Sequence, residues 1–257
     1  MSRSHLIIPD AHAHPDFSNV RFDWLSLLIK DLRPDVVVNL GDGADMPSLC
    51  SYDKGKGSFH GRTYRKDIDA FLDSQDRLWS PLRRAKKKLP QSIYLIGNHE
   101  ERIGRALNAQ PELQGTLSYD DLELSRWYDT VVGYDGGTPG VIEVDGVHYA
   151  HYFVSGVMCR PIGGEHPAYS LLAKRMVSST CGHIHVGDYC IRTKHDGNDG
   201  RKVHGLVAGV YQDYRAGFAG MANDLWWRGV IFKTEVEKGD YNVRWISLDS
   251  IRREYGS

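Results

Sequence analysis

The first hundred residues contain three short apolar runs, each followed directly by proline or glycine. Residues 6–8, 35–40 and 92–96 form these runs, and the last two are rich in valine and isoleucine. Runs of this length that are bounded by turn residues are typical of buried strands. We therefore predict three buried strands in this part of the chain.

Between these runs, apolar residues recur at a spacing of three and four positions. Residues 22–32 and 66–88 show this spacing, which predicts two helices. Pro81 lies inside the second stretch and predicts a kink or a break there. The stretch 43–61 is rich in glycine, serine and aspartate and predicts a long loop. Strands that alternate with helices indicate βαβ units and a largely parallel sheet.

The second half of the chain predicts shorter strands and no such alternation. Asp145-Gly146 lies between two apolar segments, 141–144 and 147–152, which is a strong hairpin signal. Further strands are predicted near 177–181, 189–193, 203–207, 229–235 and 242–246. We predict a single domain over residues 1–257, α/β in its first half and meandering in its second.

Composition and charge limit the classes of protein to which this chain can belong. The chain has 257 residues with 32 Lys+Arg and 33 Asp+Glu, a formal net charge of -1, so no global field attracts nucleic acid or an anionic membrane. No apolar run approaches the roughly 18 residues that span a bilayer. The four cysteines are scattered, and the N-terminus lacks a signal-peptide pattern. We expect a soluble cytoplasmic protein without an obligate protein partner.

Side chains of the metal-binding kind follow five of the predicted strands. They are, in chain order, Asp10, His12, Asp42, Asn98, His99, His151, His183 and His185. Ligands of open α/β sheets bind beyond the carboxyl ends of the strands. We therefore expect these side chains to gather at one rim.

The residue types at this rim indicate a site for a borderline metal ion. Asp10 and His12 are two positions apart, so on an extended backbone both leave the same face and can hold one ion. The same spacing holds for His183 and His185. Asp42 follows a glycine, which allows a tight turn, and its two carboxylate oxygens can bridge two cations. Imidazole, carboxylate and amide oxygen together suit Mn²⁺, Fe or Zn²⁺ rather than a Ca²⁺ cage.

Five blocks of the sequence resemble the signature of the calcineurin-like metallophosphoesterases. They are, in chain order, Asp10-x-His12, Gly41-Asp42, Gly97-Asn98-His99-Glu100, His151 and Gly182-His183-x-His185. The resemblance implies two facing mixed β-sheets flanked by helices, a four-layer α/β/β/α sandwich. It also implies a dinuclear-metal hydrolase that cleaves phosphate esters, as a phosphodiesterase or a phosphatase.

The resemblance implies a role for each of these residues. It assigns the first cation to Asp10, His12, Asp42 and His185, and the second to Asp42, Asn98, His151 and His183. His99 is implied to be a catalytic residue that binds no metal and stands beside the scissile phosphate. Two divalent ions are expected, with Mn²⁺ favoured and Fe, Zn²⁺, Ni²⁺ or Mg²⁺ as alternatives. A hydroxide that bridges them is expected to attack phosphorus.

Some positions depart from the pattern of the family or stay open. The second block keeps an acid at Asp45 but loses a later glycine. His151 is not followed by the glycine that is common in the family, so nearby His148 is a rival. The two face opposite sides of the strand, and nearness to the strand's end favours His151. Arg62 and Arg160 are candidates for binding the substrate phosphate.

Three functions stay open at this point. The first is a phosphoesterase that acts on a phosphorylated small molecule or a nucleotide, with a phosphodiester favoured. The second is a DNA or RNA nuclease of the same chemistry, and the neutral net charge argues against a processive form. The third is a non-catalytic metal-bound scaffold, against which the intact Asn98-His99 pair argues.

Overall fold

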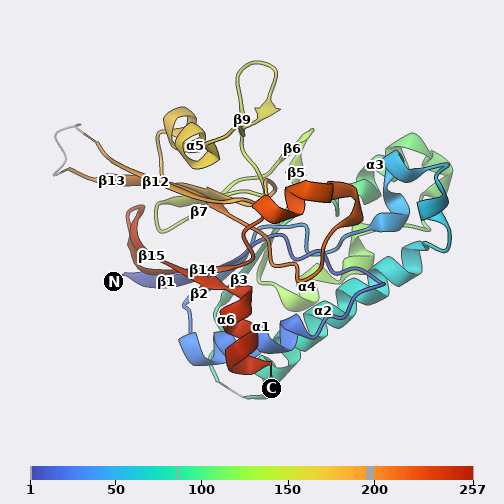
Figure 1. The fold of residues 1–257 in the computed structure, drawn as a ribbon, viewed down its shortest axis with the longest axis horizontal. Coiled ribbons are helices and arrows are strands. Elements are labelled where there is room, and N and C mark those ends of the chain that lie inside the picture. The colour runs from blue at the N-terminus through green and yellow to red at the C-terminus, as the bar shows by residue number, and fades with distance from the viewer. Residues whose placement is uncertain (1, 86, 195–199, 257) are drawn as a thin grey trace.

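Two β-sheets make up the centre of the fold (Figure 1). The computed structural model describes residues 2–85, 87–194 and 200–256. The strands of the first sheet are β1 (Arg3–Ile8), β2 (Val36–Asn39), β3 (Gln91–Leu95), β4 (Thr130–Val132), β14 (Gly229–Glu237) and β15 (Asp240–Ser247). Those of the second sheet are β7 (Ile142–Val144), β8 (Val147–Tyr149), β11 (Ser179–Cys181), β12 (Gly187–Thr193) and β13 (Lys202–Ala208). The orders are β15-β14-β1-β2-β3-β4 and β12-β13-β11-β8-β7.

The first sheet confirms the parallel arrangement that the first half of the sequence predicts. β1 pairs with β2, β2 with β3 and β3 with β4, all in parallel. The helices α1 (Arg21–Leu32) and α2 (Tyr64–Arg84) provide the crossovers that parallel neighbours require. β14 and β15 return from the end of the chain and complete the sheet in antiparallel fashion. The α/β class is therefore confirmed.

The second sheet is only partly the meander that the sequence predicts. The hairpin of β7 and β8 is confirmed, with Asp145 at φ 52° and Gly146 at φ 82° in its two-residue turn. β11, however, is parallel to both β8 and β13. The prediction is wrong here because α5 (Pro167–Arg175) carries the chain back between β8 and β11.

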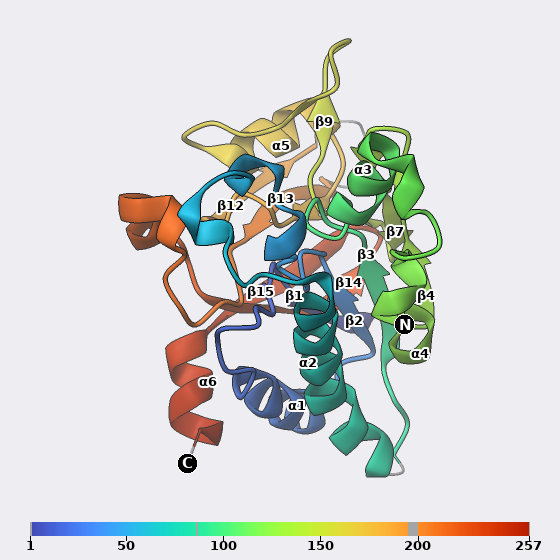
Figure 2. The ribbon, with the colours of Figure 1, turned by 90° about the vertical axis from the view of Figure 1, so that its right-hand side faces the viewer.

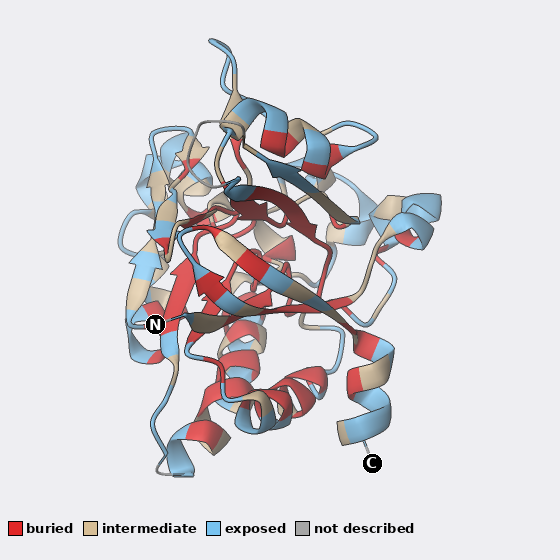
Figure 3. Ribbon diagram, turned by 90° about the vertical axis from the view of Figure 1, so that its left-hand side faces the viewer, coloured by how far each residue is buried: buried red, intermediate tan, exposed pale blue. Residues whose placement is uncertain are grey.

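Apolar side chains form three layers of packing. Figure 3 colours the buried residues red, and they gather along the strands in the centre of the ribbon. One layer lies between the first sheet and the helices α1, α2 and α6 (Leu248–Tyr255). The second lies between the two sheets, where side chains of β1, β2 and β3 meet those of β8 and β13. The third packs α5 on the outer side of the second sheet. Successive side chains of β1 and β2 point alternately into the first and the second layer. Neighbouring side chains of a strand leave opposite faces of the sheet, which explains this alternation.

The helix α2 runs through Pro81 to Arg84 without a break, so of the two outcomes predicted there, a kink or a break, the break is wrong. Pro81 has no amide to donate the usual hydrogen bond of a helix. Only three helical residues follow it, so this loss falls near the end of the helix. The expected loop contains three short 3-10 turns, η1 (Pro47–Leu49), η2 (Ser51–Asp53) and η3 (Gly57–Phe59). These turns lie beside α3 (Arg102–Ala109) in both Figure 1 and Figure 2.

The remaining elements are small and lie outside the two sheets. They are α4 (Leu124–Trp127), η4 (Pro111–Leu113), η5 (Tyr119–Leu122), η6 (Gly217–Leu225) and the strands β5 (Tyr134–Asp135), β6 (Thr138–Pro139), β9 (Val154–Ser155) and β10 (Arg160–Pro161). Within the described residues, no helix combines the length and the apolar character needed to cross a bilayer.

Candidate metal centre

The carboxyl ends of five strands meet at one place between the two sheets. The register aligns Ile8, Asn39 and Tyr94 across β1, β2 and β3, so the segments after these strands leave the same edge. The segments after β8 and β11 arrive from the second sheet. The eight side chains that the sequence singles out are all brought to this place, and six of them are buried.

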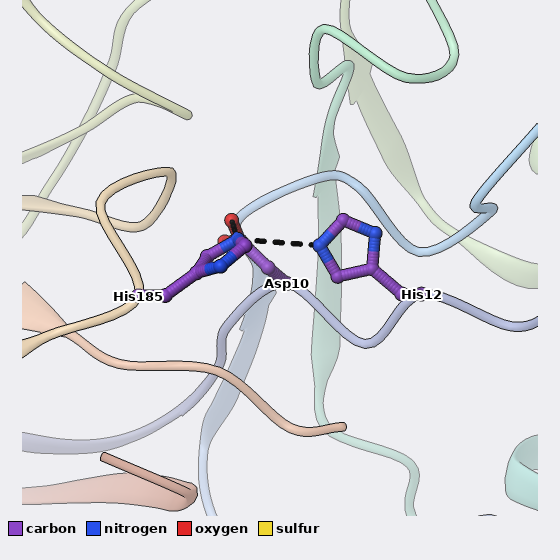
Figure 4. A group of neighbouring side chains, drawn as sticks. All are labelled: Asp10, His12 and His185. Atoms are coloured by element: carbon purple, nitrogen blue, oxygen red, sulfur yellow. Dashed lines mark hydrogen bonds and ion pairs between the residues drawn. The ribbon is translucent and has the colours of Figure 1, made fainter. Parts of the chain in front are cut away.

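The first group consists of Asp10, His12 and His185 (Figure 4). His185 Nε2 lies 3.0 Å from Asp10 Oδ2 and 3.3 Å from His12 Nε2. The ligand atoms of all three residues lie within 4.8 Å of one another. One oxygen and two imidazole nitrogens thus point at a common centre.

The second group consists of Asp42, His151 and His183, whose ligand atoms also lie within 4.8 Å of one another. His151 Nε2 lies 3.4 Å from Asp42 Oδ2 and 2.8 Å from Asn98 Oδ1. A third combination, of His12, Asp42 and His99, joins the two groups because it shares one residue with each. The donors therefore form one continuous cluster.

Several of these residues adopt left-handed backbone conformations. His12 has φ 45°, Asp42 φ 48°, His183 φ 69° and His185 φ 64°. The extended backbone expected for the Asp10-His12 and His183-His185 pairs is therefore wrong. The turns send His183 to the second group and His185 to the first. Such conformations are costly for residues with a Cβ, and they cluster at functional sites.

Three glycines permit the close approach of these turns. Gly41 has φ 93°, which confirms the tight turn expected before Asp42. A Cβ at Gly97 would overlap the Asp42 carboxylate, and one at Gly182 would overlap Asp10 Oδ1. The carboxylates of both groups therefore rest directly against glycine backbone.

Glu100 fastens the turn after β2 to the turn after β3, a role that the sequence does not indicate. Its carboxylate accepts hydrogen bonds from the backbone amides of Asp42 at 3.0 Å, Ala44 at 2.8 Å and Gly97 at 2.8 Å. The Tyr94 hydroxyl donates a fourth, also at 2.8 Å. Glu100 is fully buried, so these four donors take the place of water around its charge.

Asp45 orients the rings of two histidines. His12 Nδ1 lies 3.0 Å from Asp45 Oδ1, which leaves His12 Nε2 free to face His185. His99 Nδ1 lies 2.7 Å from the Asp45 backbone oxygen and 3.1 Å from its carboxylate. A carboxylate that binds one ring nitrogen fixes the tautomer of the imidazole and the direction in which the second ring nitrogen points. Many metal-binding histidines are oriented in this way. The acid retained in the second block was the only signal for this residue.

The ionisable groups of the centre influence one another strongly. Burial alone would raise the pKa of Asp42, but the imidazoles of His151 and His99 hold it well below its usual range. Burial opposes the charge of His151, yet the Asp42 and Asp10 carboxylates raise its pKa to about 9. Burial lowers the pKa of His183 to about 4, so its ring keeps free lone pairs at neutral pH. The centre therefore presents ionised carboxylates that attract positive charge.

The chemistry of the donors fits divalent cations. Imidazole nitrogens, two carboxylates and the Asn98 amide oxygen are the ligands of Mn²⁺, Fe and Zn²⁺ sites. Among the described residues, Asp10 Oδ1 is fully buried and has no hydrogen-bond partner. Buried polar atoms of native proteins are nearly always paired, and a cation would satisfy this one.

The rival histidine and the two arginine candidates are placed differently. His148 faces Arg175, with 3.1 Å between Nδ1 and the guanidinium, and it belongs to none of the groups. His151 alone of this pair reaches the centre. Arg62 is ion-paired with Asp53 at 2.8 Å. Arg160 is exposed on β10.

Two cavities open beside the centre and share Arg102 as a lining residue. The first cavity, of about 750 Å³, is lined by Asn98 and His183 of the centre, by the 3-10 turns and by α3. The second cavity, of about 440 Å³, is lined by His12, Asp45 and His99, and Arg62 lies on its wall. Arg160 lines neither cavity among the described residues. Arg102, which the sequence did not single out, lines both.

No family model matches this chain, and no curated protein matches it. Among solved structures, the chain is similar to TT1561 of Thermus thermophilus, with 10% identity and a TM-score of 0.34 over 95% of this chain and 99% of that one. A second solved structure gives 11% identity and a TM-score of 0.38 over 96% of this chain and 100% of that one. At such TM-scores, neither similarity carries information about the site.

Proposed function

We propose that this chain is a metal-dependent phosphoesterase of the calcineurin-like metallophosphoesterase kind. The observation that carries the proposal is the convergence of Asp, Asn and His side chains from five strand ends on one buried cluster. Two sheets with apolar layers between and outside them agree with the four-layer sandwich of that family. The order of the five sequence blocks provides independent support.

The two groups of donors would hold two divalent cations, with Mn²⁺ favoured. Asp10, His12 and His185 would hold one, His151, His183 and Asn98 the other, and Asp42 would be shared. Such ions, when bound, lower the pKa of water towards neutrality and offset the charge of the phosphate. The left-handed turns and the glycines beside them position these donors.

The surroundings of His99 support a role beside the phosphate rather than as a ligand. The Arg102 guanidinium lies 3.1 Å from His99 Nε2 and would repel a cation at that nitrogen. Burial opposes the charge of His99, but the Asp42 and Asp45 carboxylates raise the pKa of its ring above the usual value. In its protonated form, this ring can donate a proton to a leaving oxygen. Arg102 can donate to the same phosphate.

A phosphodiester is favoured because the site is open on both sides. The first and second cavities meet at Arg102, beside His99. A diester carries one group on each side of its phosphorus, and each cavity can take one of them. A monoester would leave one cavity without a role.

Hydrolysis of two model esters tests this proposal. We expect the Mn²⁺-loaded protein to release nitrophenolate from bis-p-nitrophenyl phosphate faster than from p-nitrophenyl phosphate, and to lose the activity to a chelator. Asp10→Asn should abolish the activity, while Asp16→Asn, on an 82% exposed side chain, should keep it. A protein that binds Mn²⁺ tightly and hydrolyses neither ester would be a scaffold, which would overturn the proposal.

A further inference from the structure

The first cavity carries an excess of positive charge that the metal centre does not use. Its described lining residues include Lys54, Arg102 and Arg105 but no aspartate or glutamate. Among the described residues, none of these three cations forms an ion pair with a carboxylate. The cavity is thus a cationic chamber directly beside Asn98 and His183.

The second cavity provides the contrast. Its wall contains Arg102 and three further cations, and all three of these are paired with carboxylates. Lys56 and Arg62 are paired with Asp53 at 3.2 and 2.8 Å, and Arg215 with Asp224 at 2.6 Å. Asp45 adds a further carboxylate to the same wall. Carboxylates therefore offset part of the positive charge in the second cavity, whereas none lines the first.

The two arginines are positioned by the helix and by backbone carbonyls. Arg102 and Arg105 are three residues apart on α3, so their side chains leave the same face. Arg102 donates to the backbone oxygens of Asp45 at 2.8 Å and Met46 at 3.1 Å. Arg105 donates to the backbone oxygen of Asn98. A guanidinium has five N–H donors, so each arginine keeps donors for a ligand.

We propose that the first cavity binds a second phosphate of the substrate, on the group that is esterified to the scissile phosphate. Arg105 and Lys54 are the specificity-determining residues for that phosphate. Arg102, which reaches His99, serves the scissile phosphate. This inference rests on the proposed phosphoesterase function and narrows its substrate class to esters that carry at least two phosphates.

The size and chemistry of the cavity agree with this class. At about 750 Å³ it lies in the range of pockets that enclose a ligand of nucleotide size. Tyr52 and Tyr152 line it together with the cations and offer ring faces to an aromatic group. Arginine binds phosphate in a bidentate manner, which favours a phosphate over a carboxylate or a neutral group at this position.

Two chromogenic esters that differ by one phosphate test the inference. Thymidine 5′-(p-nitrophenyl phosphate) carries the scissile phosphate alone, and its 3′-phosphorylated form carries a second one. With Mn²⁺-loaded protein, we expect a KM on the order of tenfold lower for the 3′-phosphorylated ester. Arg105→Gln and Lys54→Gln should each remove most of this difference and leave kcat/KM for the simpler ester within about twofold.

Arg253→Gln is the matched control, because Arg253 is exposed on α6 and lies outside the cavity. It should keep the preference of the wild-type protein. Equal KM values for the two esters in the wild-type protein, or a preference that survives Arg105→Gln combined with Lys54→Gln, would overturn the inference while the phosphoesterase function stands.

If neither ester is hydrolysed, the proposed phosphoesterase function is overturned. A binding measurement then tests the inference about the second phosphate separately. Calorimetry should show tighter binding of thymidine 3′,5′-bisphosphate than of thymidine 5′-phosphate, and Arg105→Gln should reduce this difference. Competition by a short single-stranded oligothymidylate or by ADP then separates a nucleic-acid strand from a nucleotide polyphosphate as the source of the second phosphate. Failure of both to compete would contradict the inference.

Discussion

His99 lies between groups of opposite charge, and this placement determines what its ring can do. Its Nδ1 faces Asp45, and its Nε2 lies 3.1 Å from the Arg102 guanidinium and 3.8 Å from Asp42 Oδ2. The backbone amide of His99 also donates to Asp42 Oδ1 at 2.8 Å. The ring is therefore fixed relative to the metal centre without having to be one of its ligands.

Replacement of this ring separates catalysis from metal binding. We expect His99→Asn to lower kcat by a factor of about 10² to 10⁴, because the general acid is lost. Bound Mn²⁺, measured by elemental analysis, should stay at the wild-type level. His60→Asn, at an exposed position, is the control and should change neither quantity. Loss of Mn²⁺ from His99→Asn would show that the ring is a ligand.

Glu100 gives a prediction about stability. Glu100→Gln removes the charge and turns one acceptor into an amide donor, which then faces backbone amides. We expect the free energy of unfolding to fall by about 2–3 kcal/mol in urea denaturation. Glu112→Gln, at an exposed position, should leave it unchanged within about 0.5 kcal/mol. An equally stable Glu100→Gln protein would contradict the role of this carboxylate in joining the two turns.

At the scale of the element, the centre depends on how the chain leaves each strand. Gly97 follows β3 and lies against the Asp42 carboxylate, where a Cβ has no room. The two turns that carry Asp42 and Asn98 therefore hold each other in place. Gly97 offers no ligand atom, but its contact with Asp42 makes it part of the candidate metal centre.

Gly97→Ala should consequently displace Asp42. We expect a decrease in Mn²⁺ affinity on the order of 10- to 100-fold, as for other residues that position metal ligands. Gly133→Ala is the control, since a Cβ there meets nothing within 4 Å. Calorimetric titration of both variants makes the comparison, and an unchanged affinity in Gly97→Ala would show that the turns adjust freely.

The sequence predicts the strand ends well because short apolar runs that end at glycine are strong local signals. For the same reason it predicts that Asp42, Asn98 and His183 lie at one rim. It does not reveal Arg102 and Arg105, because α3 has eight residues and buries only Ile103, so its helical pattern is weak.

Tertiary contacts explain what else the sequence misses. The left-handed turns at His12 and His183 depend on the partners they meet, which no local spacing encodes. The acceptor role of Glu100 likewise appears only when the turns after β2 and β3 come together. The return of β11 beside β8 depends on α5, a helix that the sequence did not indicate.

At the scale of the whole molecule, the two sheets meet through a polar network as well as an apolar core. Lys233 of β14 is fully buried and donates to Thr180 Oγ1 of β11 at 2.6 Å. His5 of β1 is also fully buried, and it contacts the Tyr149 hydroxyl at 2.7 Å and Asp145 at 2.8 Å. These contacts cross from one sheet to the other. The relative position of the two sheets therefore depends on the protonation state of these buried groups.

His5 makes the stability depend on pH. Burial lowers its pKa to about 4, although Asp145 partly offsets the effect. The unfolded chain, with an ordinary histidine pKa near 6.5, binds the proton first as the pH falls. The contribution of neutral His5 to the stability of the folded protein is thus fully present above about pH 6.5 and is lost as the pH falls towards 4.

We expect the free energy of unfolding to fall by about 2 kcal/mol more between pH 7 and pH 5 in the wild-type protein than in His5→Gln. Urea denaturation of both proteins at the two pH values measures this difference. His166→Gln, at an exposed position, should behave as the wild-type protein does. Equal losses in wild type and His5→Gln would contradict the buried neutral state of this ring.

The cluster at the meeting point of the two sheets is the feature on which the proposed chemistry depends. The most direct measurement is the number of Mn²⁺ ions bound per chain, determined by equilibrium dialysis and elemental analysis of wild type, Asp42→Asn and Asp16→Asn. We predict two ions for wild type and Asp16→Asn, and the loss of metal from Asp42→Asn, because we propose that the Asp42 carboxylate is shared by the two ions. Wild-type protein without bound Mn²⁺, or an Asp42→Asn protein that keeps both ions, would contradict the dinuclear centre.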